Sequence, residues 1–219
     1  MDRLFLEARY KQEFDIAPKI IDTLPNSVSL ATAIQFIGSI DKIRSSIESS
    51  GRTVKLIQGS HSQYPGQILG CDVHQQKVPD TECVLYIGTG RFHPLALAWK
   101  FKKKTFSFDP IANSFNEIKQ SEIKKFEAKR DSALMHFYSA STVGIVKSLK
   151  QSFNQSKIDN LLAKYPDKNF YNFVADDIDF LQLNNFPFID TWVNTACPRI
   201  TYDDYEKIDK PIADIQDLI

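Results

Sequence analysis

Short strand-like runs alternate with helical segments from Ser27 onward, and this alternation limits the possible folds more than any other feature of the sequence. Apolar residues repeat at helical spacing over 33–50, and Gly51 is placed to end that helix. The strand-like runs of this half are 28–32, 53–58, 83–87 and 105–109, and a second helix is expected over 95–101. Because a β-α-β order with glycine-rich loops is typical of parallel sheets, the sequence predicts an α/β fold.

A second unit of the same kind follows a long amphipathic helix that we expect over 121–138. Its strand-like runs are 143–148, 169–175 and 188–193, and its helical patterns cover 156–164 and 177–183. The tail over 210–219 is predicted to be a terminal helix opened by Pro211. The expected architecture is two similar parallel-sheet domains, over 27–120 and 121–219, with helices on both faces of each sheet and a cleft between the domains.

The composition excludes several classes of function. The 219 residues include 27 basic and 27 acidic side chains, so the net charge of zero gives no general attraction to nucleic acids or membranes. No apolar run approaches the roughly 20 residues that cross a bilayer, and the amino terminus lacks the pattern of a signal peptide. We therefore expect a soluble, cytoplasmic protein without a membrane partner and without direct contact with nucleic acid.

Two of the three cysteines lie on loops that follow strand-like runs. Cys197 follows the run over 188–193, and Cys71 ends a glycine-punctuated turn after the run over 53–58. Open α/β sheets build their ligand sites at such strand ends, and cysteines of a reducing compartment are buried, metal-bound or catalytic. Core burial and metal ligation are equally open for these two residues. Cys83 begins a strand and is predicted to lie in the core.

The turn Gly88-Thr89-Gly90 after the strand over 83–87 is a candidate binding loop. Its glycines would let a ligand approach the backbone amides, and the helix that follows would present its positive end to an anion. The alternative is a tight strand-to-helix turn without a ligand, since the third glycine of a dinucleotide loop is absent. His93 could bind substrate, transfer a proton or cap the helix, and a structural role is favoured for a single histidine.

Other polar residues leave further alternatives open. The acidic pairs at 176–177 and 203–204 are potential bases or metal ligands, although such pairs more often lie in caps and solvated turns. The lysines at 102–104 are expected to be a solvated helix end, with a docking patch as the alternative. A zinc site made of Cys71, Cys197 and a histidine is a further hypothesis. The histidines outside the binding loop are His61, His74 and His136.

Four spaced segments of the sequence form a pattern when they are taken together. The segments are LATAIQF at 30–36, PGQILGC at 65–71, LYIGTGRFHP at 85–94, and FPF at 186–188 leading to ACPRI at 196–200 with the acidic pair at 203–204. Together they resemble the diphthamide synthesis proteins of archaea and eukaryotes. They fall in order across residues 27–210, so the resemblance is more specific than any single motif of this chain.

This resemblance implies an enzyme whose 4Fe-4S cluster is held by three cysteines, one from each of three similar domains. Cys71 and Cys197 match the second and third of these cysteines. S-adenosylmethionine would bind the open iron, and its reductive cleavage would yield a 3-amino-3-carboxypropyl radical that adds to a histidine of elongation factor 2. The further residues that match the family's cofactor crevice or the last domain's first loop are Gln67, Gly88, Thr89, Gly90, His93, Ser148 and Lys150.

The family's first domain, with its own cysteine, has no counterpart in this sequence. A strand expected over 4–8 and a helix expected over 15–24 match the end of that domain, so residues 1–26 are interpreted as its remnant. A separate polypeptide that completes the site, an accessory subunit that has lost catalysis, and a fragment are the three open explanations. The leading hypothesis is a transferase component that acts on elongation factor 2, and the alternative is a non-catalytic binding subunit of the same pathway. Because the family acts as dimers, a homo- or heterodimer is expected.

Overall fold

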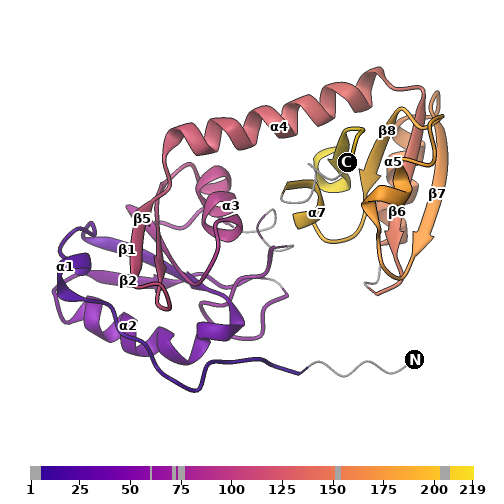
Figure 1. The fold of residues 1–219 in the computed structure, drawn as a ribbon. Coiled ribbons are helices and arrows are strands. Elements are labelled where there is room, and N and C mark those ends of the chain that lie inside the picture. The colour runs from indigo at the N-terminus through magenta and orange to yellow at the C-terminus, as the bar shows by residue number, and fades with distance from the viewer. Residues whose placement is uncertain (1–5, 60, 71–72, 74–76, 151–153, 203–207) are drawn as a thin grey trace. The chain divides into compact units, whose positions relative to one another are not determined.

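The chain divides into two compact units, Met1–Ile123 and Lys124–Ile219, and each unit contains one sheet (Figure 1). The computed structural model describes residues 6–59, 61–70, 73, 77–150, 154–202 and 208–219. None of the helices in these ranges combines the length and the apolar character that crossing a bilayer requires.

The sheet of the first unit has five strands in the order β2-β1-β3-β4-β5. The strands are β1 (Ser27–Thr32), β2 (Thr53–Leu56), β3 (Cys83–Ile87), β4 (Lys104–Asp109) and β5 (Ser114–Glu117). The first four are parallel, whereas β5 runs antiparallel to β4 at the edge of the sheet. The Asp109 carboxylate accepts the backbone N–H groups of Ile111 and Ala112 and so shapes the turn between β4 and β5.

Helices cover both faces of this sheet. They are α1 (Pro18–Ile21), the 3₁₀ helix η1 (Ile34–Ser39), α2 (Ile40–Glu48) and α3 (Phe92–Phe101). Ile43 and Ile47 of α2 pack in one buried cluster with Leu85 of β3, whereas Leu97 of α3 packs in another cluster with Val84 of the same strand. Since neighbouring residues of a strand point to opposite faces, α2 and α3 lie on opposite sides of the sheet. The predicted α/β architecture is confirmed in this unit.

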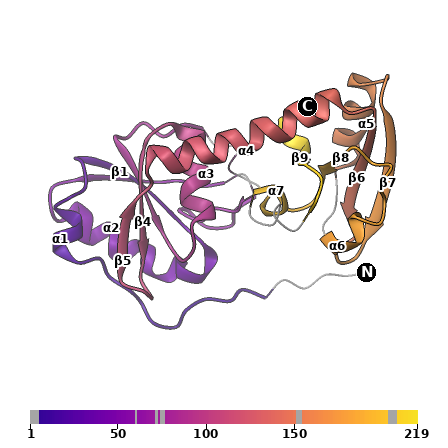
Figure 2. The same ribbon diagram turned by 45° about the horizontal axis from the view of Figure 1, so that its top comes forward.

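The sheet of the second unit is entirely parallel, with strand order β7-β6-β8-β9. The long helix α4 (Gln120–Ser139) crosses the division between the two units. The elements that follow it are β6 (Thr142–Ser148), α5 (Gln155–Lys164), β7 (Asn169–Ala175), α6 (Phe180–Leu183), β8 (Thr191–Asn194), α7 (Arg199–Tyr202), β9 (Ile212–Asp214) and the 3₁₀ turn η4 (Ile215–Asp217). Phe137 and Ile158 are buried in one cluster with Val193, and the neighbouring Trp192 lies in a separate cluster on the other face of β8. Figure 2 shows the strands of this sheet, with β6 and β7 side by side. This unit is again α/β.

Two of the predicted helices differ from what the structure shows. The terminal helix predicted over 210–219 is wrong, because Ile212–Asp214 pairs with β8 as strand β9 and only the short turn η4 follows. Pro211 does not open a helix, and its carbonyl oxygen accepts the backbone N–H of Trp192 instead. The helix predicted over 33–50 begins as the 3₁₀ helix η1, although Gly51 ends it with a φ of 85° as expected.

The segment before β1 contains less regular structure than the sequence predicts. The helix expected over 15–24 is reduced to α1, which Pro18 begins and Ile21 ends. Of the strand expected over 4–8, residues 4 and 5 lie outside the described residues, and residues 6–8 have no regular secondary structure. Apolar side chains of this segment still pack on the first unit, since Ile16, Ile20 and Leu24 belong to the cluster that contains α2.

Candidate functional site

The loop that carries Cys197 is closed by the last residue of β8. We call residues 195–198 the Cys197 loop. Asn194 is fully buried, and its Nδ2 donates to the carbonyl oxygen of Cys197 at 2.9 Å. Its Oδ1 accepts the backbone N–H of Ala196 at 3.0 Å. One carboxamide therefore holds both sides of the turn, while Cys197 itself is half-buried with a free thiol.

Two further side chains hold the carboxamide of Asn194 in place. Its Nδ2 lies 3.2 Å from the hydroxyl oxygen of Thr201 and 3.2 Å from Oδ2 of Asp214. The pKa of Asp214 is raised to about 7, mainly by burial and to a smaller degree by the nearby Asp217, although hydrogen bonds from the Gln216 N–H and from Asn194 and the charge of Lys157 oppose this rise. The loop thus rests on a buried carboxyl group that titrates near neutral pH.

Ser148 lies at the same edge of the second sheet as Cys197. This carboxyl edge is the edge at which the parallel strands end, and β6 and β8 are direct neighbours there. The Ser148 hydroxyl donates to the carbonyl oxygen of Asp176 at 3.3 Å and accepts the N–H of Lys150 at 3.2 Å. Thr195 fastens the Cys197 loop to β6, because its N–H and its hydroxyl both donate to the Val146 carbonyl oxygen. The second sheet therefore brings two of the predicted site residues to one edge.

Gln67 shapes the loop over 63–70 at the carboxyl edge of the first sheet. Its Oε1 accepts the N–H groups of Gln63 at 2.9 Å and Tyr64 at 3.1 Å. The same loop is tied to the end of β1, since the Thr32 N–H donates to the Gly66 carbonyl and the Ile68 N–H donates to the Thr32 carbonyl. The acceptor oxygen of Gln67 is thus engaged by the backbone of its own loop, which stands next to the end of β1.

The Gly88-Thr89-Gly90 turn follows β3 at this same edge, as predicted. A side chain at Gly88 would meet Tyr86, whose hydroxyl oxygen lies 2.8 Å from an ideal Cβ position, and Gly90 has a φ of 79°. Both positions therefore require glycine. The turn leads directly into α3, which begins at Phe92.

His93 has a partner that sequence reasoning missed. Its Nδ1 lies 3.2 Å from the Tyr86 hydroxyl, and the two rings stack with centroids 5.5 Å apart. The residue before Cys71 lies close by, because a Cβ at Gly70 would be 3.8 Å from Nε2 of His93. Tyr86 lies on β3 and His93 lies in α3, on either side of the glycine turn. A spacing of seven residues across a turn is not a recognised motif, so the sequence gave no signal of this pair. The first edge thus gathers His93, the glycine turn and the loop over 63–70.

Cys83 is not a candidate ligand. It begins β3, at the end of the strand opposite to the glycine turn, and its side chain is fully buried. Burial raises the pKa of its thiol to about 12, and the adjacent Glu82 adds to this effect while Lys104 opposes it. The prediction that Cys83 belongs to the core is confirmed.

Several predicted site residues lie outside the described part of the chain. They are Cys71, His74 and the acidic pair at 203–204. Within the described residues, no group of three or more His, Cys, Asp or Glu side chains is arranged to hold a metal ion. Asp177 of the other acidic pair forms an ion pair with Lys150 and is mostly exposed, in keeping with a solvated turn.

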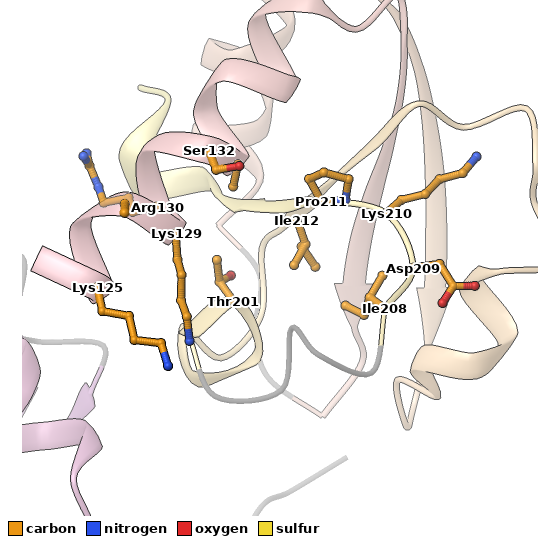
Figure 3. Close-up of a pocket in the computed structure, with 12 residues that line it drawn as sticks. Lys125, Lys129, Arg130, Ser132, Thr201, Ile208, Asp209, Lys210, Pro211 and Ile212 are labelled. Atoms are coloured by element: carbon orange, nitrogen blue, oxygen red, sulfur yellow. The ribbon is translucent and has the colours of Figure 1, made fainter. Parts of the chain in front are cut away.

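The second unit also contains a cavity of about 480 Å³ that sequence reasoning did not find. Its apolar wall includes Ile208, Pro211 and Ile212, and Lys125 and Lys129 of α4 line it together with Thr201 (Figure 3). Lys129 and Lys125 are one helical turn apart. Thr201 connects this cavity to the buried network, since its hydroxyl oxygen is an acceptor for Asn194.

The described geometry defines a class of protein: an α/β protein with two parallel-sheet units whose candidate ligands lie at the carboxyl edges of the sheets. A family model described as "Putative diphthamide synthesis protein" matches residues 4–218. The chain therefore belongs to the diphthamide synthesis protein family, as the resemblance implied.

Characterised relatives and solved structures agree with this assignment. The chain is 32% identical to the 2-(3-amino-3-carboxypropyl)histidine synthase of Pyrococcus horikoshii over 197 residues, which cover 88% of this chain and 56% of the relative. It is 34% identical to the enzyme of the same name from Methanocaldococcus jannaschii over 151 residues, which cover 68% of this chain and 44% of the relative. The chain spans about half the length of these relatives.

The fold also matches a solved structure of the family. Dph2 from Pyrococcus horikoshii, solved with a 4Fe-4S cluster, superposes with a TM-score of 0.78 and 28% identity, over 90% of this chain and 58% of that chain. A second structure of the same protein gives the same TM-score.

Proposed function

We propose that this chain is a component of a 2-(3-amino-3-carboxypropyl)histidine synthase. It would take part in the transfer of the 3-amino-3-carboxypropyl group from S-adenosylmethionine to a histidine of elongation factor 2. The family membership and the names of the relatives support this proposal. Since the chain spans about half of those relatives, the activity is proposed for an assembly that contains it.

Cys71 and Cys197 are proposed as cluster ligands. The observation that carries this assignment is the half-buried free thiol of Cys197, held at the carboxyl edge on a loop whose backbone is tied on both sides. Thiolate sulfur is the usual ligand of iron–sulfur clusters, and the related Dph2 structure was solved with a 4Fe-4S cluster. When bound, such a cluster supplies the electron that cleaves the carbon–sulfur bond of S-adenosylmethionine.

The first edge is proposed to bind part of S-adenosylmethionine. The backbone amides of Thr89 and Gly90 are proposed to receive a carboxylate, because the two glycines leave the turn without long side chains. Gly88 is proposed to contribute through its missing side chain, since its N–H donates to the carbonyl oxygen of Phe108 at 2.9 Å. His93 is held by Tyr86 in a fixed ring orientation and is proposed to contact the same ligand. Gln67 is proposed to act through the shape of its loop, since its oxygen is engaged by backbone N–H groups. Ser148 is proposed as a cofactor-binding residue at the corresponding edge of the second unit.

The third cluster cysteine is proposed to come from a first domain of the family's type, carried by a partner or by a further part of the same protein. The domains at 27–120 and 121–219 contribute Cys71 and Cys197, residues 1–26 are proposed to continue a first domain, and Cys83 is buried at the wrong end of its strand. A homo- or heterodimer, or a separate chain that carries the first domain, would complete the set of three thiolates.

Anaerobic reconstitution tests the proposal directly. The chain would be reconstituted with iron and sulfide, alone and together with a family member that carries the first domain. We expect iron, sulfide and a cluster spectrum in the mixture, a loss of cluster in Cys71→Ala and Cys197→Ala, and no loss in the control Cys83→Ala. Absence of a cluster in every preparation of the unmodified chain would contradict the proposal. If both alanine variants kept full activity on elongation factor 2, the chain would be a non-catalytic subunit instead.

A further inference from the structure

The Cys197 loop is supported by a buried pair of side chains that the proposed function does not use. We infer that Asn194 and Asp214 are positioning residues, which hold this loop in the conformation that a cluster ligand requires. The inference rests on the proposed function only in the statement that Cys197 binds a cluster. The hydrogen bonds that restrain the loop are a property of the chain itself.

Asn194 restrains the peptide backbone on both sides of the Cys197 turn. Its carboxamide accepts from Ala196 and donates to the carbonyl oxygen of Cys197, at 3.0 and 2.9 Å. Because Ala196 and Cys197 are adjacent, a single rigid side chain fixes the direction of the peptide that leads to the sulfur. The side chain is fully buried, so water does not compete for these hydrogen bonds.

Asp214 decides which way the carboxamide of Asn194 is turned. It comes from β9, where it is the direct Cα partner of Asn194 across the sheet. Its Oδ2 accepts from Asn194, and its Oδ1 accepts the N–H of Gln216 at 3.0 Å. Three acceptors, on Asp214, Thr201 and Cys197, surround one end of the carboxamide, and the N–H of Ala196 faces the other. A flipped amide would place its oxygen against the carbonyl oxygen of Cys197 and its amino group against the N–H of Ala196, so only one orientation satisfies both backbone groups.

Such an arrangement matters for a ligand because a thiolate that is already in place loses less freedom when metal binds. Groups behind a metal ligand commonly change metal affinity by about 10- to 100-fold when they are removed. The same pair could instead serve only to fasten β9 to β8, which would affect stability without affecting the loop. The two roles predict different results for Cys197 itself.

The apo protein separates these roles. In a Cys71→Ser background, the rate of Cys197 alkylation by iodoacetamide would be followed by peptide mapping at fixed pH, together with hydrogen exchange of the 195–200 peptide. Asn194→Ala should raise both rates about five- to tenfold, as expected when buried hydrogen bonds no longer restrain the loop. Asp214→Leu should give a smaller increase, and Asp214→Asn should restore rates near those of the parent, because it keeps an acceptor for Asn194.

Asn172→Ala is a matched control on an exposed position of β7 and should leave both rates unchanged. Rates in Asn194→Ala and Asp214→Leu that equal those of the parent, in proteins that remain folded, would overturn the inference. If Asn194→Ala did not fold, the difference between Asp214→Leu and Asp214→Asn would decide in the same way. If the parent chain bound no cluster while the Asn194→Ala and Asp214→Leu variants still showed the faster rates, the proposed function would be contradicted. The inferred restraint on the Cys197 loop would then still hold.

Discussion

The carboxyl edges of the two units use different means to form their loops. At the first edge, the loop over 63–70 is tied to Thr32 by backbone hydrogen bonds, and glycines keep the turn after β3 open. At the second edge, buried side chains of Asn194, Thr201 and Asp214 carry the Cys197 loop. The first edge therefore depends on the absence of side chains, whereas the second depends on their presence.

The largest expected effect is a pH dependence of stability that originates at the second edge. Burial raises the pKa of Asp214 to about 7 in the folded protein, from the ordinary value of 3.8 for an aspartate. The folded state therefore binds the proton more tightly, and stability from this group is present below about pH 4 and is lost as the pH rises toward 7. A difference of about three pKa units corresponds to roughly 4 kcal/mol as an upper limit.

Asp214→Asn should remove this loss. Urea unfolding of the parent and of the variant between pH 4 and pH 8 would show the variant gaining stability relative to the parent as the pH rises. The charged neighbours Asp217 and Lys157 stay in place in both proteins, so the difference reports the Asp214 carboxyl together with its interactions with these two groups. A difference that does not change with pH would mean that the Asp214 carboxyl is not held protonated in the folded state.

The second largest effect is expected from adding a side chain at a glycine of the first edge. Gly88→Ala should destabilise the first unit by about 2 kcal/mol, because the added Cβ lies 2.8 Å from the Tyr86 hydroxyl oxygen at a φ of 151°. It should also displace Tyr86 from His93. Gly38→Ala is the matched control, since nothing lies within 4 Å of its added Cβ. Thermal unfolding that is equal for both variants would contradict this account of the edge.

A moderate effect is expected from the oxygen of Gln67. Gln67→Ala leaves the N–H groups of Gln63 and Tyr64 without their acceptor and should cost about 1 to 2 kcal/mol in unfolding free energy. Gln67→Glu keeps an acceptor and should cost less. Equal losses for the two variants would show that the loop does not depend on this oxygen.

The smallest effect concerns a surface ion pair near the first edge. Burial alone would raise the pKa of Glu122, but the hydrogen bonds from Arg91 and from the Lys119 N–H outweigh it and lower this pKa. Stability from the pair is therefore present above the unfolded pKa and is lost as the pH falls through the lowered one. Because both side chains are more than a third exposed, Glu122→Gln should cost at most about 0.5 kcal/mol of unfolding free energy, and less at high salt. A loss of several kcal/mol in denaturant unfolding would contradict this weak role.

The elements that were predicted correctly have a common physical basis. Strands β3, β6 and β7 begin and end within one residue of their expected limits, because continuous runs of β-branched and aromatic residues are bounded by turns. Strand β9 was missed, since three residues are too few to show a period. Strand β5 was missed because it is a half-exposed edge strand whose segment contains mostly polar residues.

The sequence by itself determined the α/β class, the family, and the placement of Cys197 behind a strand, since these depend on local patterns and on residues close together in the chain. Only the tertiary structure decided that Tyr86 holds His93 and that Asp214 supports Asn194. The second pair is separated by 20 residues in the chain and meets through the pairing of β8 with β9. Strand pairing brings distant residues together without leaving any spacing in the sequence by which to find them.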